Sequence, residues 1–221
     1  MIEIIKVDNA VTIATVNDLR QYYVSVESAI QKRLNEFQVI GKGSSKQLFQ
    51  ELIFCILTAN ASAKMAMKAV SVIDDDTLFL GNEKDISTCL KGVYRFPRSR
   101  ANYIVRTRHF LKGYCDLDVR KIFDQYDGLA LREFLAKFLC GIGYKESSHF
   151  LRNIGFKGFA ILDKHIISML NLLGCNVQKP CNKKEYCKVE LIMKDFAKRY
   201  ELDFDELDLL FWSYKTGEII K

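Results

Sequence analysis

The stretch "LCGIGYKESSHFLRNIG", residues 139–155, predicts a tight hairpin between two helices. The segment before it, "LREFLAKFLC", has its apolar residues on one helical face, and helical spacing resumes at "YKESSHFLRNIG". Gly141 and Gly143 permit positive φ and leave the backbone bare, so that N–H groups and the start of the second helix can converge on one phosphate. We therefore expect a helix-hairpin-helix over residues 129–155 that grips a nucleic-acid backbone, although the glycines alone also fit a simple tight turn.

Lys145 stands in the first turn of the second helix, where a positive side chain opposes the helix dipole. A purely structural sequence more often has Asp, Glu or Ser at that position. A nucleophilic amine must lose its proton, which the helix end favours and which burial or neighbouring cations must complete. Asp163, in "FAILDKHI", follows after one helix and a loop, which are long enough to fold it back toward Lys145. As an alternative, Asp163 is simply a helix N-cap, and the two roles are compatible.

The remaining sequence predicts an all-α protein. It has 221 residues, only 2 prolines and apolar residues at three- and four-residue spacing almost throughout. Residues 1–221 are interpreted as one unit of two closely joined helical lobes, with no repeat or long linker. The opening "MIEIIKV" is predicted as a short strand. Helices are expected from Asn17, from Ser44, and near 62–74, 99–113, 129–140, 145–154, 163–173, 188–200 and 204–214.

Charge and cysteine content narrow the class of protein. The formal net charge of +6 favours polyanionic partners. No apolar run reaches the roughly 20 residues of a membrane helix, and the N-terminus lacks a signal-peptide pattern, so an intracellular, prokaryotic-type cytoplasmic location is expected. Cys175, Cys181 and Cys187 lack a fourth ligand and are interpreted as free or structural rather than metal-binding.

The glycine hairpin, the lysine and the later aspartate resemble the helix-hairpin-helix DNA glycosylases that carry a catalytic lysine. Within that group, "GIGYKESSHFLRNIGF" and "ILDKHI" resemble the type 2 8-oxoguanine DNA glycosylase/lyase family. The resemblance implies an active site in a cleft between two lobes. It implies that Lys145 attacks the sugar C1′ and forms a Schiff base, that Asp163 stabilises the positive sugar or helps deprotonate the amine, and that β-elimination cuts the strand. It implies no metal and no cofactor.

The same resemblance suggests how a damaged base is reached. An enzyme that acts on a base in a duplex must extrude it and fill the gap. Asn60, in "LTANASAKM", is similar to the family's wedge, although it also fits a residue that ends the preceding helix. Phe96 and Trp212 resemble the two walls of a base pocket, although a single tryptophan is more often a core residue. Lys221 would offer an ammonium and a carboxylate to the N7–H that distinguishes 8-oxoguanine from guanine.

A second nucleic-acid surface is predicted in "VYRFPRSRANYIVRTRHF", where arginines alternate with aromatic residues. The leading hypothesis is a monomeric enzyme that excises 8-oxoguanine from double-stranded DNA and cuts the strand at abasic sites. The alternatives are a helix-hairpin-helix glycosylase for another damaged base, and a helix-hairpin-helix protein that binds DNA without cutting it. Lys145 together with Asp163 argues against the last of these.

Overall fold

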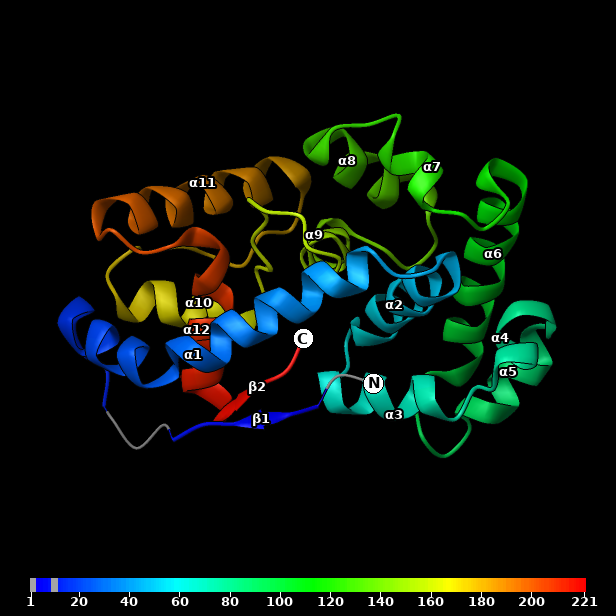
Figure 1. Ribbon diagram of the computed structural model, residues 1–221, viewed down its shortest axis with the longest axis horizontal. Coiled ribbons are helices and arrows are strands. Elements are labelled where there is room, and N and C mark those ends of the chain that lie inside the picture. Colours follow the sequence, from blue (N-terminus) through cyan, green and yellow to red (C-terminus); the bar gives the residue numbers. More distant parts are fainter. Residues whose placement is uncertain (1–2, 9–11) are drawn as a thin grey trace. The chain divides into compact units, whose positions relative to one another are not determined.

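The computed structural model describes residues 3–8 and 12–221. These residues form twelve helices and one antiparallel pair of short strands, as Figure 1 shows. The elements in chain order are β1 (Ile5–Lys6), α1 (Val16–Gly41), α2 (Ser45–Thr58), α3 (Ala63–Ser71), α4 (Asp75–Leu80), α5 (Glu83–Leu90), α6 (Pro97–Cys115), α7 (Arg120–Phe123), α8 (Gly128–Phe138), α9 (Tyr144–Asn153), α10 (Lys164–Leu172), α11 (Lys183–Arg199), α12 (Phe204–Thr216) and β2 (Glu218–Ile219).

The predicted all-α class is confirmed, and the structure adds elements that the sequence pattern missed. The helices α4, α5 and α7 are short and bury few apolar side chains, so their periodicity is weak. The expected strand is reduced to Ile5–Lys6, and Met1 and Ile2 lie outside the described residues. Within the described part of the chain, no helix is both long enough and apolar enough to cross a membrane.

The chain divides into two compact units. Unit 1 consists of residues 1–39 and 155–221, and unit 2 consists of the continuous segment 40–154. Unit 2 therefore contains α8, the hairpin and α9, whereas unit 1 contains α10 and α12. The predicted catalytic and binding residues are thus divided between the two units.

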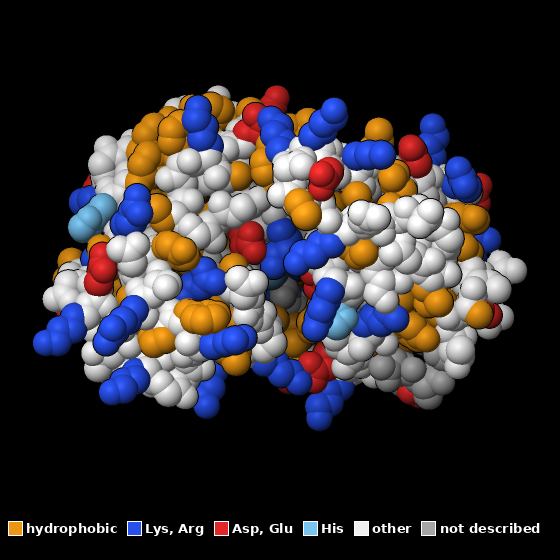
Figure 2. Space-filling model, turned by 180° about the vertical axis from the view of Figure 1, so that it is seen from behind, with side chains coloured by type: hydrophobic (Ala, Val, Ile, Leu, Met, Phe, Trp, Pro, Cys, Tyr) orange, Lys and Arg blue, Asp and Glu red, His pale blue; other side chains and the backbone are white. Residues whose placement is uncertain are grey.

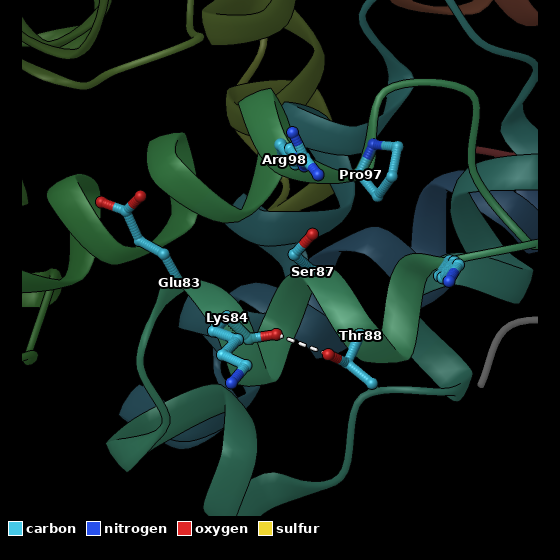
Figure 3. Close-up of a pocket in the computed structure, with 7 residues that line it drawn as sticks. Glu83, Lys84, Ser87, Thr88, Pro97 and Arg98 are labelled. Carbon is cyan, nitrogen blue, oxygen red and sulfur yellow. Dashed lines mark hydrogen bonds between the residues drawn. The ribbon is translucent and has the colours of Figure 1, made fainter.

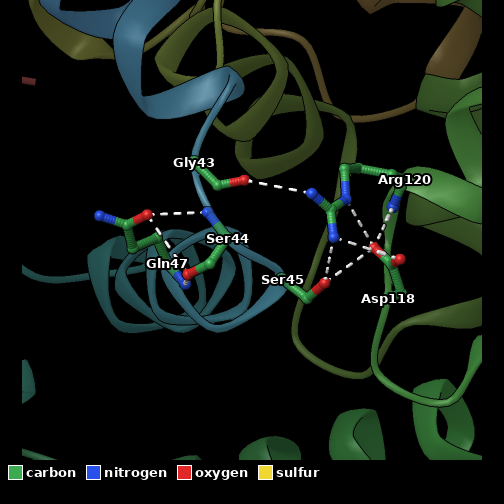
Figure 4. Close-up of polar contacts among 6 residues, drawn as sticks. All are labelled: Gly43, Ser44, Ser45, Gln47, Asp118 and Arg120. Carbon is green, nitrogen blue, oxygen red and sulfur yellow. Dashed lines mark hydrogen bonds and ion pairs between the residues drawn. The ribbon is translucent and has the colours of Figure 1, made fainter.

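The core of unit 2 is built around α2, whose side chains from Leu48 to Leu57 are almost all buried. This helix packs against α3, α6 and α9. A capping box at Ser44 and Gln47 starts it, and both residues appear in Figure 4. In the same figure the Arg120 guanidinium bonds Ser45 Oγ (2.6 Å) and Asp118 Oδ1 (2.8 Å), which ties α7 to the start of α2. The hydrogen bond from Arg120 holds the pKa of the Asp118 carboxyl below its usual range.

The core of unit 1 brings together segments from both ends of the sequence. β1 pairs with β2, with Ile5 opposite Ile219 (Figure 1). The fully buried Arg33 guanidinium of α1 donates to the carbonyls of Glu3 and Ile219. α12 packs against α10, α11 and β2. These contacts hold the segment that follows α12, including the buried Ile219 and Ile220, in a fixed place.

Candidate active site

The predicted helix-hairpin-helix is present as α8, a short loop and α9. Gly141 has φ of +78°, and a Cβ at this position would lie 2.6 Å from a ring carbon of Tyr103, so both the backbone and the space require glycine. The Thr107 hydroxyl donates to the carbonyl of Cys140 (3.3 Å), which ties the loop to α6. The prediction for Gly143 needs correction, because its φ is −105° and it serves as the N-cap of α9 rather than as a left-handed residue.

Lys145 lies in the first turn of α9, as predicted, and forms an ion pair that the sequence analysis did not anticipate. Its Nζ is 3.0 Å from Glu146 Oε1, and 30% of the lysine side chain is exposed against 12% of the glutamate side chain. Glu146 Oε2 accepts the Gly143 N–H (3.2 Å) as part of a capping box. One carboxylate thus joins the hairpin backbone to the lysine amine. The signal for Glu146 was its position three residues after the N-cap, which is typical of this box.

The rest of α9 is polar in sequence yet buried in the structure. The Arg132 guanidinium of α8 lies 5.1 Å from the centre of the Tyr144 ring and donates to Ser148 Oγ (3.3 Å). From α2, Glu51 accepts a hydrogen bond from Asn153 Nδ2 (2.6 Å). Buried hydrogen bonds of this kind are directional and expensive to break. They fix α9, and with it Lys145, relative to α2 and α8.

Asp163 lies in unit 1 and is the N-cap of α10, as the alternative interpretation held. Its Oδ1 accepts the N–H groups of His165 (2.8 Å) and Ile166 (2.9 Å). Among the described residues, Oδ2 of this half-buried side chain accepts no hydrogen bond. One oxygen therefore suffices to cap the helix.

The loop before Asp163 is held by side chains of α11 and α12. Glu190 accepts the Ala160 N–H (3.0 Å), and the Tyr186 hydroxyl donates to the Ala160 carbonyl (2.6 Å) while accepting the Leu162 N–H (3.3 Å). Both Tyr186 and Glu190 are only 4% exposed. Nearer the start of the loop, Asp205 of α12 accepts the Gly158 N–H (2.6 Å), and burial raises the pKa of its carboxyl. Asp163 is consequently presented by a rigid loop.

Tyr186→Phe should lower the free energy of unfolding by about 1 to 3 kcal/mol, because it leaves the buried Leu162 N–H and Ala160 carbonyl without their partner. Urea unfolding followed by circular dichroism measures the change. Tyr114→Phe is the matched control, since the Tyr114 hydroxyl bonds Gln125 on the surface and its loss should cost little. Equal midpoints for the two variants would mean that Tyr186 does not hold the loop.

Asn60 and Phe96 belong to unit 2 and are linked through the backbone that carries them. Asn60 follows α2 in the left-handed conformation, with φ of +61°, and its side chain is exposed. It therefore both ends the helix and presents its amide to solvent. Tyr94 donates to the Leu57 carbonyl (2.6 Å), and Arg100 donates to that of Ala59. Phe96 lies between these two anchors at the N-cap of α6, and 42% of its surface is exposed.

Only some of the arginines in the second predicted nucleic-acid surface are accessible to a ligand. Arg95, Arg98 and Arg106 are exposed. Arg100 and Arg108, however, are buried, and the Arg108 guanidinium donates to the Leu78 carbonyl (2.8 Å) and to that of Gly81 (2.5 Å). These two arginines join α6 to the backbone around it and are not available to a phosphate. Lysine and arginine side chains predominate over acidic ones on the face that Figure 2 shows.

A cavity of about 560 Å³ lies between α5 and the start of α6, shown in Figure 3. Its lining is rich in cations and hydroxyls and consists of Glu83, Lys84, Ser87, Thr88, Lys91, Pro97 and Arg98. The single carboxylate, Glu83, accepts a hydrogen bond from Asn102 Nδ2 (2.9 Å). Among the described residues, no acidic side chain pairs with Lys84, Lys91 or Arg98. The cavity is therefore suited to an anion.

Trp212 and Lys221, the other predicted pocket residues, lie in unit 1. Trp212 of α12 is half-buried, and the centre of its ring system lies 6.1 Å from that of His165 in an edge-on arrangement. Sequence reasoning missed His165, whose place in the first turn of α10 follows directly from the Asp163 cap. Lys221 is half-buried next to the buried Ile220. Asp163, His165 and Trp212 thus come from one core, and Lys145, Asn60 and Phe96 come from the other.

The cysteines form no cluster with metal-ligating neighbours. Cys181 and Cys187 are exposed, and burial raises the pKa of the half-buried Cys175 thiol. Across residues 3–8 and 12–221, no group of three or more His, Cys, Asp or Glu side chains is placed to hold a metal ion.

The sequence matches proteins that act on oxidised DNA. A family model described as 8-oxoguanine DNA glycosylase covers residues 30–202. The 8-oxoguanine DNA glycosylase/AP lyase of Thermoplasma acidophilum is 37% identical over 215 residues, which is 97% of this chain and 100% of that protein. The enzyme of the same description from Korarchaeum cryptofilum is 36% identical over 209 residues, with 93% of this chain and 97% of that protein covered.

Solved structures with the same fold belong to the same group. The Methanocaldococcus jannaschii 8-oxoguanine glycosylase/lyase, crystallised with a 15mer DNA containing 8-oxoguanine, superposes with a TM-score of 0.83 and is 34% identical, covering 93% of this chain and 99% of that one. The 8-oxoguanine DNA glycosylase of Thermotoga maritima gives a TM-score of 0.83 at 33% identity, covering 93% and 98%.

Proposed function

The chain belongs to the 8-oxoguanine DNA glycosylase/AP lyase family, and from that premise we propose that its reaction proceeds through a Schiff base at Lys145 with the help of Asp163. The observation that supports this assignment is the place of Lys145. A primary amine follows directly after a glycine hairpin whose backbone suits a phosphate, in the first turn of a helix that buried hydrogen bonds hold in place.

In the proposed first step, the neutral Lys145 amine attacks the sugar C1′ as the bond from C1′ to the base breaks, and the base leaves. The sugar carries positive charge in the transition state, and the Asp163 carboxylate stabilises it through Oδ2. The attached amine gives up a proton, the bond from C1′ to the ring oxygen breaks, and that oxygen takes up a proton, which leaves a protonated imine between Lys145 and the opened sugar. β-Elimination breaks the bond to the 3′ phosphate, and water finally releases the lysine. No metal or redox group enters any of these steps.

We propose that Phe96 and Trp212 bound the base pocket, that Lys221 contributes to its polar edge, and that Asn60 enters the stack that the base leaves. The exposed ring of Phe96 and the half-buried ring of Trp212 are both available for stacking. The amides around Gly141 and Gly143 bind the backbone of the same strand without reading its sequence. The proposed partner is double-stranded DNA that contains 8-oxoguanine or an abasic site, and the protein is proposed to act on it as a monomer.

A panel of duplex oligonucleotides tests this proposal. Duplexes with 8-oxoguanine, with other damaged bases and with a preformed abasic site are incubated with the protein in two separate reactions. One contains no reductant and reports base release and strand cleavage, and the other contains sodium borohydride, which reduces an imine to a stable bond. We expect a covalent complex and strand cleavage with the abasic duplex, and base release that is fastest with 8-oxoguanine. Cleavage without any covalent complex would rule out the Schiff base.

The cavity between α5 and α6 is expected to bind a DNA backbone phosphate near the lesion. Pro97, the residue after Phe96, lines it, and so do three cations that form no ion pair with the acidic side chains described in the structure. Replacing these three by alanine should weaken binding to an uncleavable abasic duplex about tenfold at 0.1 M salt and should flatten the salt dependence of log Kd by about one phosphate contact. Fluorescence anisotropy over a salt series measures both. The substitutions are Lys84→Ala, Lys91→Ala and Arg98→Ala.

The matched control removes three exposed lysines of α11, and so the same net charge, by Lys184→Ala, Lys188→Ala and Lys198→Ala. Cleavage at saturating DNA should be unchanged in both triple variants, since neither touches the reacting groups. If both variants lose the same affinity and salt dependence, the cavity has no specific part in binding.

A further inference from the structure

Among the residues that the structure describes, Glu146 is the one charged side chain that contacts both the hairpin and Lys145. Its two carboxylate oxygens have different partners, with Oε2 on the Gly143 N–H at 3.2 Å and Oε1 on the Lys145 ammonium at 3.0 Å. The carboxylate is largely buried, with 12% of the side chain exposed. It therefore occupies a position next to the backbone amides where the proposed function requires a phosphate.

The other charged groups around α9 have different partners or lie further along the helix. Of the elements that pack on α9, α8 presents Arg132, which stacks on Tyr144 and bonds Ser148. From α2, Glu51 is bonded to Asn153 at the far end of the helix. The other titratable groups of α9 are His149 and Arg152, both buried further along it. In the described structure, the pair with Glu146 is the one ion pair that Lys145 forms.

We propose that Glu146 is a positioning residue that restrains Lys145 until a DNA phosphate reaches the hairpin and displaces its carboxylate. The inference rests on the proposed function. A phosphate that binds the hairpin amides competes with the Glu146 carboxylate for the Gly143 N–H. The phosphate and the carboxylate, both negatively charged, also repel each other at this distance. Both oxygens belong to one carboxylate, so a side chain that leaves the Gly143 N–H also leaves Lys145. The carboxylate then no longer holds Nζ of Lys145 beside the start of α9, and the side chain is free to reach the sugar.

Glu146→Gln separates this role from helix capping. Glutamine at the third position of a capping box still accepts the N-cap N–H, so the fold should be retained, but the charge is removed. Asp85→Asn is the matched control. Asp85 holds the same position in the capping box of α5 and accepts the Asn82 N–H (2.8 Å), and within the described part of the chain it forms no ion pair with a lysine. Glu146→Ala removes both the cap and the charge.

The first measurement is made without DNA. Each protein is briefly treated with formaldehyde and borohydride, and methylation of Lys145 relative to the other lysines is read by peptide mass spectrometry. The Lys145 side chain is 30% exposed, so water partly screens its ion pair, and we expect Lys145 labelling to rise about two- to fivefold in Glu146→Gln and Glu146→Ala and to stay at the wild-type level in Asp85→Asn. If Lys145 is labelled to the same extent in Glu146→Gln as in wild type, Glu146 does not restrain Lys145.

The second measurement is binding to an uncleavable abasic duplex. Glu146→Gln should bind about three- to fivefold more tightly than wild type, since the phosphate no longer has to displace an anion, whereas Asp85→Asn should change little. If Glu146→Gln binds this duplex no more tightly than Asp85→Asn does, a DNA phosphate does not displace the Glu146 carboxylate. If wild type itself forms no covalent complex with abasic DNA, the proposed function fails, while the labelling result still decides whether Glu146 restrains Lys145.

Discussion

The Lys145→Gln protein should form no covalent complex with abasic DNA when borohydride is added, because an amide cannot form an imine. Strand cleavage at the abasic site should fall by at least about a thousandfold, as it does when a nucleophile is removed from other enzymes. DNA binding should largely survive, since the hairpin backbone and the cations of the α5–α6 cavity are unchanged. Gel separation of trapped and cleaved products measures the first two quantities, and fluorescence anisotropy measures the third.

Lys137→Gln is the control for this experiment. Lys137 is an exposed lysine near the end of α8, one loop away, where its ammonium lies 5.1 Å from the centre of the Phe138 ring. Its replacement removes the same charge from the same motif and should leave trapping at the wild-type level. Undiminished trapping by Lys145→Gln would assign the nucleophile to another amine.

Asp163→Asn should slow the excision of 8-oxoguanine about a hundredfold to a thousandfold, the usual cost of removing one group that stabilises charge in a transition state. The amide oxygen of asparagine can still accept the His165 and Ile166 N–H groups, so the start of α10 should remain intact. Single-turnover excision at saturating enzyme measures the effect, and the melting temperature checks the fold.

Asp74→Asn is the matched control for the Asp163 substitution. Asp74 caps α4 by accepting the Thr77 N–H (2.9 Å), and no chemical role is proposed for it. This variant should excise 8-oxoguanine at the wild-type rate. If Asp163→Asn does the same with an intact fold, Asp163 is a cap and nothing more.

The sequence predicted the long helices and the hairpin well because their signals are local. Apolar spacing in α8, the glycine at Gly141 and the N-cap at Asp163 each depend on a few neighbouring residues. The same spacing was uninformative for α5, which has only Ile86 and Leu90 buried although Asn82 and Asp85 form a capping box at its start. A helix with few apolar residues can be recognised in a sequence only by its capping residues.

The errors concern side chains whose environment depends on distant segments. Arg100 and Arg108 alternate with aromatic residues, as is typical of a nucleic-acid surface. In the structure, however, their guanidinium groups donate hydrogen bonds to the carbonyls of Ala59 and Leu78. The partner of Lys145 was missed for a different reason. Glu146 was visible as its neighbour, but adjacent helical residues are not expected to face each other, and only the structure shows the two side chains in contact.

The division of the chain also fixes an order of events during synthesis on the ribosome. Unit 2 is one continuous segment, whereas unit 1 needs α1 from the beginning of the sequence and α12 and β2 from its far end. Domains generally fold as they emerge, so unit 2 can close around α2 while α1 still lacks its partners. We therefore expect Lys145 to reach its place before Asp163, so that a nascent chain ending before residue 163 has the folded amine without the carboxylate. Glycosylase activity should then appear only late in translation, when the segment that carries β2 has emerged and β1 has its partner.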